Sequence, residues 1–232
     1  MKCSVALLIL LHTCSTMQAQ QTIGIKLNGG LSNIVERNDN EQALKHIFYL
    51  QPSYHAGIYY SIRLPHRFNF GLELLFIKIN GKQYTGIPYT DNNNNPTGEY
   101  SSDTVWRHFS YVGLPLYIGY CYKKLNVNLG VQANVRLGGN VRDKGSALSN
   151  GDTIRWENKS KNLSGIDKVD MGLKAGFIVD IHKGFALEAT YYYGLNNLYR
   201  EAFTNWKLKS RQCTVGLRYT CYTRNRKTVL KK

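Results

Sequence analysis

The sequence predicts an all-β fold: an eight-stranded antiparallel up-and-down transmembrane β-barrel, with short periplasmic turns and long extracellular loops. Residues 125–137 read LNVNLGVQANVRL, in which apolar side chains occupy every second position and therefore share one face of an extended strand. Thirteen residues exceed the about 5 to 6 usual in soluble sheets and suit the about 9 to 11 that cross a bilayer at a tilt. Seven other stretches alternate similarly, and long and short connections alternate between the strands, as in membrane barrels.

The N-terminus has the composition of a secretory signal peptide, which we assign to residues 1–19. Lys2 precedes an apolar run over residues 5–11, and small or polar residues lead to a cleavage position near Ala19. The run is too short to span a membrane as a helix. Lipidation of Cys14 is the competing interpretation.

The domain boundaries then follow: a barrel over residues 20–222 and a basic tail over residues 223–232. The chain of 232 residues carries 30 Lys and Arg against 15 acids, a net charge of +15. These charges are spread over loops, strand interiors and the tail, which is typical of solvated or paired charges. A nucleic-acid partner is not expected for an exported chain. The tail is either a disordered basic end or a contact with a periplasmic partner or lipid headgroups.

The first three predicted strands cover residues 22–31, 53–63 and 67–78. Each places apolar side chains at alternate positions, as Ile23 and Ile25 do in the first. A polar segment, residues 32–50, separates the first two strands, and a tight connection through Pro65 joins the second to the third. Residues 80–107, which contain NNNNPTG, predict a long irregular loop.

The remaining predicted strands cover residues 109–122, 125–137, 169–181, 185–197 and 213–221. Pro115 cannot donate to a β-ladder, which predicts a bulge or weakened pairing there. Tight turns near Lys123 and Gly184 alternate with a second long polar loop, residues 138–168, and a loop through Trp206. This alternation places both termini on the periplasmic side.

Charged side chains on the inward positions predict a polar network in the lumen. Its expected members are Lys26, Arg63, Glu73, Arg136, Asp170, Lys174, Glu188 and Arg218. Side chains fill the interior of an eight-stranded barrel, and an unpaired buried charge is costly. We therefore expect a plug of salt bridges, with a proton or small-ion path as the alternative.

Outward aromatic residues near the strand ends predict two girdles at the membrane interfaces. Those near the short turns are Tyr60, Phe68, Tyr120, Phe185 and Tyr219, and those near the long loops are Tyr54, Phe76 and Tyr193. A further set of aromatic residues falls in the long loops: Tyr84, Tyr89, Tyr100, Trp106 and Trp156. They could contact a partner, a glycan or lipopolysaccharide, or pack loop on loop.

No catalytic or metal-binding motif is evident, so we expect neither enzyme activity nor a cofactor nor a metal. The histidines that remain after signal cleavage are scattered over opposite ends of the predicted barrel, and only His55 and His108 approach the outer rim. The mature chain keeps Cys121, Cys213 and Cys221, an odd count that defines no disulfide framework.

Five stretches resemble the PorT-like outer-membrane β-barrel family: GIKLNGGLSNI, YVGLPLYIGY, LNVNLGVQANV, DMGLKAGFIVD and GFALEATYYYGLNNL. The resemblance covers about residues 22–222 and implies a Gram-negative outer-membrane location, with no catalytic residues to carry over. It also implies a role as an accessory in protein secretion, as for the founding member. Barrels of this kind usually end at an aromatic residue; Tyr222 could be that residue, but the tail continues beyond it.

The expected function is therefore that of a non-catalytic outer-membrane protein with a structural, binding or secretion-accessory role. Its expected contacts are outer-membrane lipid and lipopolysaccharide, with secretion-system or periplasmic proteins as further partners. The alternative is a secreted lipocalin-like barrel that binds a small apolar ligand. Such a barrel would need its apolar residues, including Val127, Leu129 and Val131, inside.

Overall fold

The computed structural model describes residues 20–38, 45–90, 96–149, 152–199 and 206–224. The predicted signal peptide, with Cys3 and Cys14, lies outside the described residues, as do residues 225–232 of the predicted tail. Within the described part of the chain, no helix is both long and apolar enough to cross a membrane.

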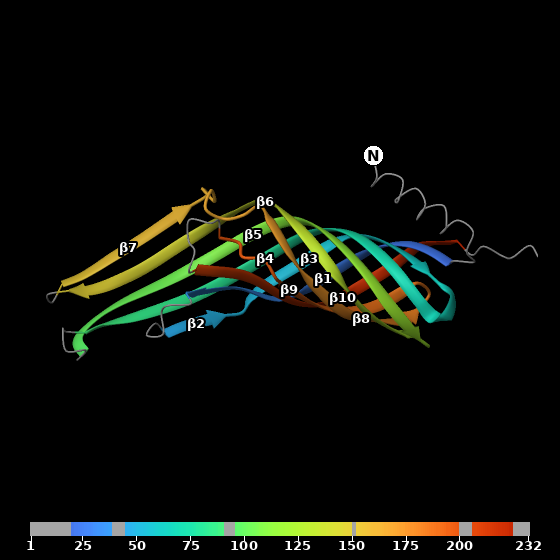
Figure 1. Cartoon of the computed structure of the whole chain (residues 1–232), viewed down its shortest axis with the longest axis horizontal. Helices are drawn as coiled ribbons and strands as arrows, with labels where there is room; N and C mark the ends of the chain where they lie inside the picture. The colour runs from blue at the N-terminus through green and yellow to red at the C-terminus, as the bar shows by residue number, and fades with distance from the viewer. Residues whose placement is uncertain (1–19, 39–44, 91–95, 150–151, 200–205, 225–232) are drawn as a thin grey trace, which may run out of the picture.

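Eight antiparallel strands close into a ring in the order β1–β3–β4–β5–β6–β8–β9–β10, and β10 pairs back with β1 (Figure 1). The ring strands are β1 (Gln20–Asn38), β3 (Gln51–Arg63), β4 (Phe68–Thr90), β5 (Pro96–Tyr122), β6 (Leu125–Ser149), β8 (Val169–His182), β9 (Phe185–Gly194) and β10 (Trp206–Arg224). Two further strands, β2 (Lys45–Tyr49) and β7 (Asp152–Ser160), pair with β4 and β6 outside the ring. The predicted eight-stranded up-and-down barrel is confirmed.

The apolar face of each strand points away from the barrel interior. In β6, Val127, Leu129 and Val131 are 54%, 60% and 55% exposed, while Asn128 and Gln132, on the opposite face of the strand, are buried. The lipocalin-like alternative, which requires the opposite orientation, is therefore wrong.

The connections at one end of the barrel are as short as expected. Lys123 turns β5 into β6 and Lys183 turns β8 into β9, both with positive φ (54° and 45°). Gly184 follows at a φ of 87°, a conformation that glycine adopts without a steric penalty. Between β3 and β4 a single 3-10 turn, η1 (Pro65–Arg67), makes the connection.

The long connections differ from the prediction, because strands replace much of the expected irregular structure. β4, β5 and β6 run for 23, 27 and 25 residues, against 14 and 10 for β8 and β9. Pairing of β4 with β3 ends at Lys78, and pairing of β6 with β8 ends at Val135. Beyond these points the three strands leave the ring together, so residues 80–107 and 138–168 are not loops throughout.

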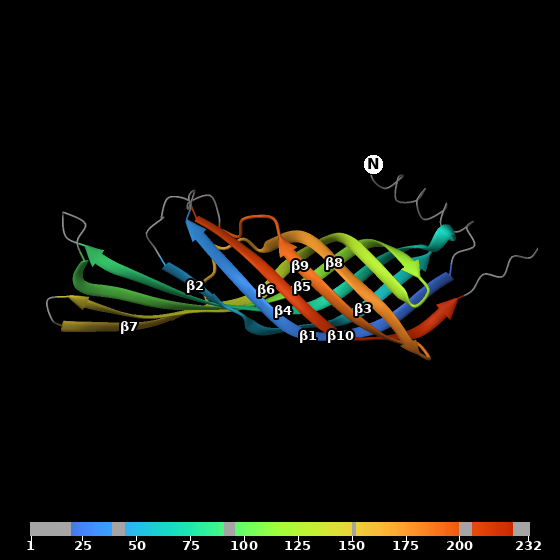
Figure 2. The ribbon, with the colours of Figure 1, turned by 90° about the horizontal axis from the view of Figure 1, so that it is seen from below.

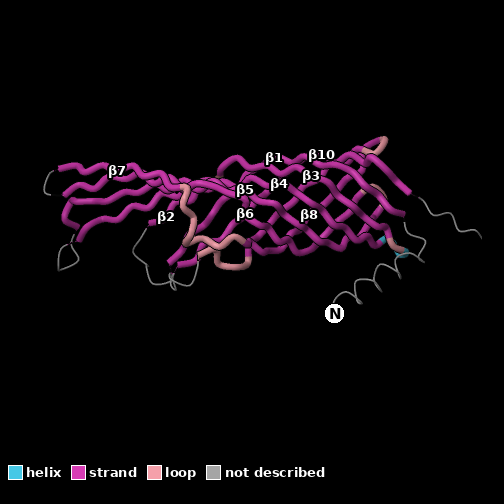
Figure 3. The backbone as a smooth tube through the Cα atoms, turned by 90° about the horizontal axis from the view of Figure 1, so that it is seen from above, coloured by secondary structure: helices cyan, strands magenta, loops and turns pink. Residues whose placement is uncertain are grey.

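The strands that leave the ring form what we call the projecting sheet: residues 80–90, 96–108 and 138–149 together with β2 and β7. Its strand order is β2–β4–β5–β6–β7. Figure 2 shows it as a flat extension beyond one end of the barrel, and Figure 3 shows the same strands without a break at the rim. The polar segment 32–50 is likewise strand over much of its described length, since β1 continues to Asn38 and β2 follows.

Two irregularities mark the part of β5 that belongs to the barrel wall. Its ladder with β4 passes from Leu72↔Leu116 to Leu75↔Gly113 without a change of register, so Pro115 weakens the pairing but forms no bulge with β4. The register with β6 does shift, between Ser110 and Tyr111, at the level where the projecting sheet begins.

β1 starts and β10 ends on the side of the short turns. Gln21 in β1 pairs with Arg224 in β10. The last strand therefore extends two residues beyond Tyr222, the boundary expected from the sequence, and takes Thr223 and Arg224 from the predicted tail.

Candidate functional site

Five of the predicted lumen residues meet in one ionic cluster at mid-height in the barrel. Its members are Lys26 (β1), Glu73 (β4), Lys174 (β8), Glu188 (β9) and Arg218 (β10), all at most 4% exposed. Each comes from an inward position of an alternating strand, so the pattern that makes the outside apolar also directs these charges inward.

Glu73 is the centre of the ionic cluster. Its Oε2 atom lies 3.1 Å from Lys26 Nζ and 2.5 Å from Lys174 Nζ, and its Oε1 atom lies 3.8 Å from the Arg218 guanidinium. Glu188 completes the ring, with Oε2 at 2.5 Å from Lys26 Nζ and Oε1 at 3.7 Å from Arg218. Three cations thus share two carboxylates, an arrangement that leaves no charge in the cluster without an opposite partner.

Two inward tyrosines complete the cluster, and the sequence interpretation overlooked both. The Tyr59 ring lies 3.8 Å below the Arg218 guanidinium, and the Tyr117 hydroxyl accepts a hydrogen bond from Arg218 at 3.2 Å. Gly24 and Gly71 make room for them: a Cβ at Gly24 would lie 2.5 Å from the Tyr59 hydroxyl and one at Gly71 2.0 Å from the Tyr117 ring. The sequence signal for these two tyrosines was therefore an inward glycine on the neighbouring strand, opposite each inward tyrosine.

The other three predicted lumen residues lie elsewhere. Arg63 is exposed at the end of β3, on the side of the short turns. Asp170 is fully buried and accepts a hydrogen bond from the Ser210 hydroxyl at 2.5 Å. Arg136 lies at the outer end, where its guanidinium donates to the carbonyl oxygens of Leu163 and Ile166 at 3.1 and 2.9 Å. It joins β6 to the connection that follows β7.

An apolar plug closes the outer end of the barrel above the ionic cluster. Its buried members are Ile34, Leu75, Ile77, Ile79, Phe109, Tyr111, Ile166, Leu198 and Leu208. Two connections fold across the mouth to supply Ile166 and Leu198, and their backbones are joined by a hydrogen bond from Asp167 N–H to the Leu198 carbonyl at 2.7 Å. The plug was not expected, because several of its residues fall in segments that the sequence assigned to loops.

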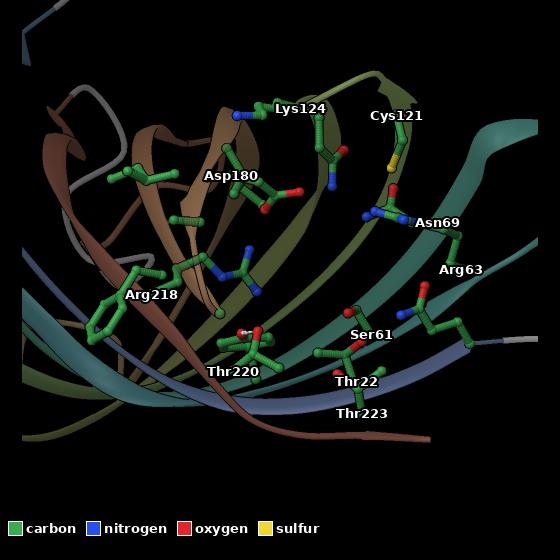
Figure 4. Close-up of a pocket in the computed structure, with 18 of the residues that line it drawn as sticks. Thr22, Ser61, Arg63, Asn69, Cys121, Lys124, Asp180, Arg218, Thr220 and Thr223 are labelled. Carbon is green, nitrogen blue, oxygen red and sulfur yellow. Dashed lines mark hydrogen bonds between the residues drawn. The ribbon is translucent and has the colours of Figure 1, made fainter. Parts of the chain in front are cut away.

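A polar cavity of about 490 Å³ opens at the opposite end, on the side of the short turns (Figure 4). Arg218 and Tyr117 of the cluster line it, and Arg63, Lys124 and Asp180 lie nearer the strand ends. We call this cavity the vestibule. The barrel interior therefore has three levels: an open vestibule, a charged cluster and an apolar plug.

The predicted girdle residues lie on the outer surface near the two ends of the barrel. At the end with the short turns Phe68 stacks edge to face with Tyr120, with ring centroids 5.5 Å apart, and Phe185 contacts Tyr219 at 4.7 Å. At the outer end the Tyr54 and Phe76 rings are 6.4 Å apart. Two members are less exposed than the others: Tyr60 is half-buried, and Tyr193 lies beneath the Arg211 guanidinium at 5.0 Å.

The aromatic residues assigned to long loops instead belong to strands of the projecting sheet. Tyr84 and Trp106 are half-buried on β4 and β5, and Trp156 is 37% exposed on β7. Tyr89 and Tyr100 lie in the same two strands, but their side chains are outside the described set. Regular backbone pairing thus fixes the positions of the Tyr84, Trp106 and Trp156 rings.

In the part of the chain that the structure describes, the remaining reactive side chains form no recognisable site. Cys121 is a buried free thiol that lines the vestibule, while Cys213 and Cys221 are exposed free thiols. Among the described residues, no three His, Cys, Asp or Glu side chains are grouped as metal ligands would be. The two histidines considered above are separate: His55 is buried, and His108 contacts Asn80 through Nδ1 at 2.9 Å.

Comparison with protein families decides the affiliation. Residues 18–200 match the model of the outer membrane protein beta-barrel domain. The chain belongs to this family. The protein is therefore located in the outer membrane, and its apolar outer face is the surface in contact with lipid. The match does not extend to the narrower PorT assignment. No curated protein matches the sequence.

Several solved structures match this chain at low sequence identity. Neisserial surface protein A is 11% identical, with a TM-score of 0.38, over 85% of this chain and 96% of that one. OprG from Pseudomonas aeruginosa is 9% identical, with a TM-score of 0.37, over 89% and 97%. The attachment invasion locus protein Ail of Yersinia pestis, solved with the heparin analogue sucrose octasulfate, is 14% identical, with a TM-score of 0.33, over 88% and 100%.

Proposed function

We propose that this protein is a non-catalytic and non-conducting outer-membrane anchor that holds the projecting sheet above the bilayer to bind a partner outside the cell. The observation that carries the proposal is the length of β4, β5 and β6, which continue beyond the barrel as paired strands. Long paired strands hold a surface more rigidly than loops of the same length, and rigid surfaces bind at a lower entropic cost.

The closed interior supports an anchoring role over a transport role. A solute that entered the vestibule would meet the ionic cluster and then the apolar plug. The smallest membrane barrels have interiors that side chains can fill, whereas water-filled channels occur in barrels of 16 or more strands. Passage would require breaking both layers, so neither solute transport nor a proton path is the proposed activity.

The inner face and free edge of the projecting sheet are the proposed contact surface. Here the inner face means the side continuous with the barrel lumen. On β7 it presents Ile154, which is 59% exposed, and Trp156. Among the described strands, β7 pairs with β6 alone, along one edge. Its other edge offers backbone groups to which an extended segment of a partner could add as a further strand.

Photocrosslinking in intact cells tests this proposal. A photoreactive phenylalanine analogue at Ile154 should give a discrete protein adduct, and the same analogue at Leu129, which is 60% exposed on the lipid face, should give lipid adducts alone. A matching adduct pattern at the two sites would contradict the proposal. The proposal includes export by the predicted signal peptide, so the N-terminal sequence of the mature protein should begin near Gln20.

A secretion-accessory role on the periplasmic side is the second candidate, and the vestibule favours it. This cavity is open, polar and bordered by Lys124, His182 and Lys183, which could receive an acidic segment of a periplasmic or secretion-system protein. If this second candidate is correct, the photoreactive analogue at Lys124, and not the one at Ile154, should yield the protein adduct. Neither candidate involves nucleic acid, a cofactor or a metal.

A further inference from the structure

The two faces of the projecting sheet carry opposite charge. The outward face continues the lipid-facing side of the barrel, and its described charged residues are Lys82, Arg142, Lys144, Arg155, Lys159 and Glu157. Those of the inner face are Asp103, Asp143, Asp152 and Arg107, and Arg107 forms an ion pair with Glu36 of β1. The assignment follows from strand alternation and from the registers that join the five strands.

One row of side chains crosses the whole outward face. Tyr49, Lys82, Trp106, Arg142 and Lys159 occupy directly opposed positions on β2, β4, β5, β6 and β7. Lys82 Nζ lies 4.9 Å from the centre of the Tyr49 ring and 5.4 Å from that of Trp106, and the Arg142 guanidinium lies 5.7 Å from Trp106. Cations therefore alternate with flat rings along the row.

Further cations extend this row into an array. Lys144 occupies the next outward position on β6, opposite Glu157 of β7, and Arg155 lies one outward position beyond Glu157 on β7; both cations are exposed. Arg142 has an acidic partner in Glu157, at 2.6 Å, but this pair is about half exposed on each side. Adjacent strands are about 4.8 Å apart, and alternate residues on one strand are about 6.7 Å apart. Several phosphates of one ligand could thus each contact a separate cation.

The height and direction of this face indicate which anion lies opposite it. Lys82 is six residues beyond Phe76 of the outer girdle, or about 20 Å along the strand and about 15 Å above the girdle at the usual strand tilt. A phospholipid headgroup layer is only about 5 to 8 Å deep. The face also points sideways, over the surrounding leaflet, whereas the inner face lies over the barrel mouth.

We propose that the outward face of the projecting sheet binds the phosphorylated sugar headgroup of a neighbouring outer-leaflet glycolipid, lipopolysaccharide, through the cation and aromatic row centred on Lys82, Trp106 and Arg142. Phosphates contact the ammonium and guanidinium groups, and sugar rings lie against the aromatic side chains. This contact goes beyond the proposed function, because it uses the opposite face of the sheet. It orients the sheet on the membrane and leaves the inner face and the β7 edge free for a partner.

Titration of the full-length protein in neutral detergent with purified lipopolysaccharide truncated to its phosphorylated inner core tests the proposal. Bound copies are counted by native mass spectrometry, and tryptophan fluorescence follows the contact at Trp106. The test variant combines Lys82→Gln, Arg142→Gln and Lys144→Gln. The matched control combines Lys123→Gln, Lys124→Gln and Lys183→Gln, which removes the same charge from the periplasmic turns.

Three cations near an anionic surface contribute enough that the test variant should bind at least about tenfold more weakly than wild type. The control should bind as wild type does, and dephosphorylated lipopolysaccharide should bind both proteins weakly. Equal binding by the test variant and the control would overturn the proposal. The proposal would also be overturned if wild type bound heparin as tightly as lipopolysaccharide and the test variant lost heparin binding. The face would then recognise a soluble polyanion. Adduct formation at Ile154 should be the same in every variant, which separates this test from that of the proposed function.

Discussion

At the scale of single residues, the barrel interior depends most on Glu73. Its carboxylate contacts Lys26 and Lys174 directly and lies near Arg218, and all four side chains are almost fully buried. Removing one member of a buried ion pair leaves its partner charged and desolvated, which costs more than the pair itself contributes. In Glu73→Gln, Glu188 would have to neutralise three cations alone.

We therefore expect Glu73→Gln to lower the free energy of unfolding by about 3 to 5 kcal/mol, measured by urea titration of the refolded barrel and by its heat-dependent shift in gel mobility. Glu157→Gln is the control, because it removes a carboxylate from the exposed pair with Arg142 and should cost at most about 1 kcal/mol. A loss no larger for Glu73→Gln than for Glu157→Gln would show that the cluster is solvated or rearranges.

A second residue-level effect concerns pH and the projecting sheet. Partial burial, with the nearby Asp143 carboxylate as the next cause, raises the pKa of Asp103 above its ordinary value. The folded sheet therefore binds a proton more tightly than the unfolded chain does. By linkage, this contribution to stability is fully present below the ordinary pKa of an aspartate and is lost as pH rises through the higher folded value.

The projecting sheet should accordingly resist proteolysis better at mildly acidic pH than at pH 7. Asp103→Asn should raise its protection at pH 7 by a small amount, under about 1 kcal/mol because the site is partly exposed, and should flatten the pH dependence. The matched control is Asp152→Asn, which removes an exposed acid from the same face and should change neither property. Limited proteolysis over a pH series, with cleavage sites identified by mass spectrometry, provides the measurement.

At the scale of elements, β4 shows why the sequence predicted the barrel well and the outer region poorly. Up to Leu74 its apolar residues point outward, toward lipid. From Leu75 the pattern changes phase: Leu75, Ile77 and Ile79 are buried inside, while Lys78 and Asn80 point outward. The strand does not end there; its surroundings change from lipid to water, and the apolar side accordingly changes from outside to inside.

The same phase change occurs in β5, where Phe109 and Tyr111 are buried inside and Val112 and Leu114 point outward. A search for continued outward alternation stops at this level, so the outer parts of three strands were assigned to loops. The ionic cluster was predictable because inward charges in a narrow barrel must pair. The apolar plug was not, because Ile166 and Leu198 come from irregular connections whose path over the barrel mouth only tertiary packing determines.

At the scale of the whole molecule, the structure combines two kinds of interior along one axis. The charged cluster lies within the membrane-spanning part, and the apolar plug extends from the level of the outer girdle into the part where the barrel wall is surrounded by water. Each layer is arranged as its surroundings require: polar groups pair inside an apolar shell, and apolar groups gather inside a polar one. The projecting sheet stands on this closed base, so force or ligand binding at the sheet acts on a filled and rigid barrel.

The closed base predicts one-sided access to the vestibule. With Cys213→Ser and Cys221→Ser, Cys121 remains as the thiol in the described chain, and it lines the vestibule below both closing layers. A small charged maleimide should label it when the periplasmic side is exposed in spheroplasts or inverted vesicles, and should not label it from outside in intact cells. Combining Phe109→Ala with Tyr111→Ala, which empties much of the apolar plug, should still leave outside labelling low, because the ionic cluster remains. Rapid labelling of the Cys121 protein from outside, with the plug intact, would show that the lumen conducts solutes and would replace the anchor with a pore.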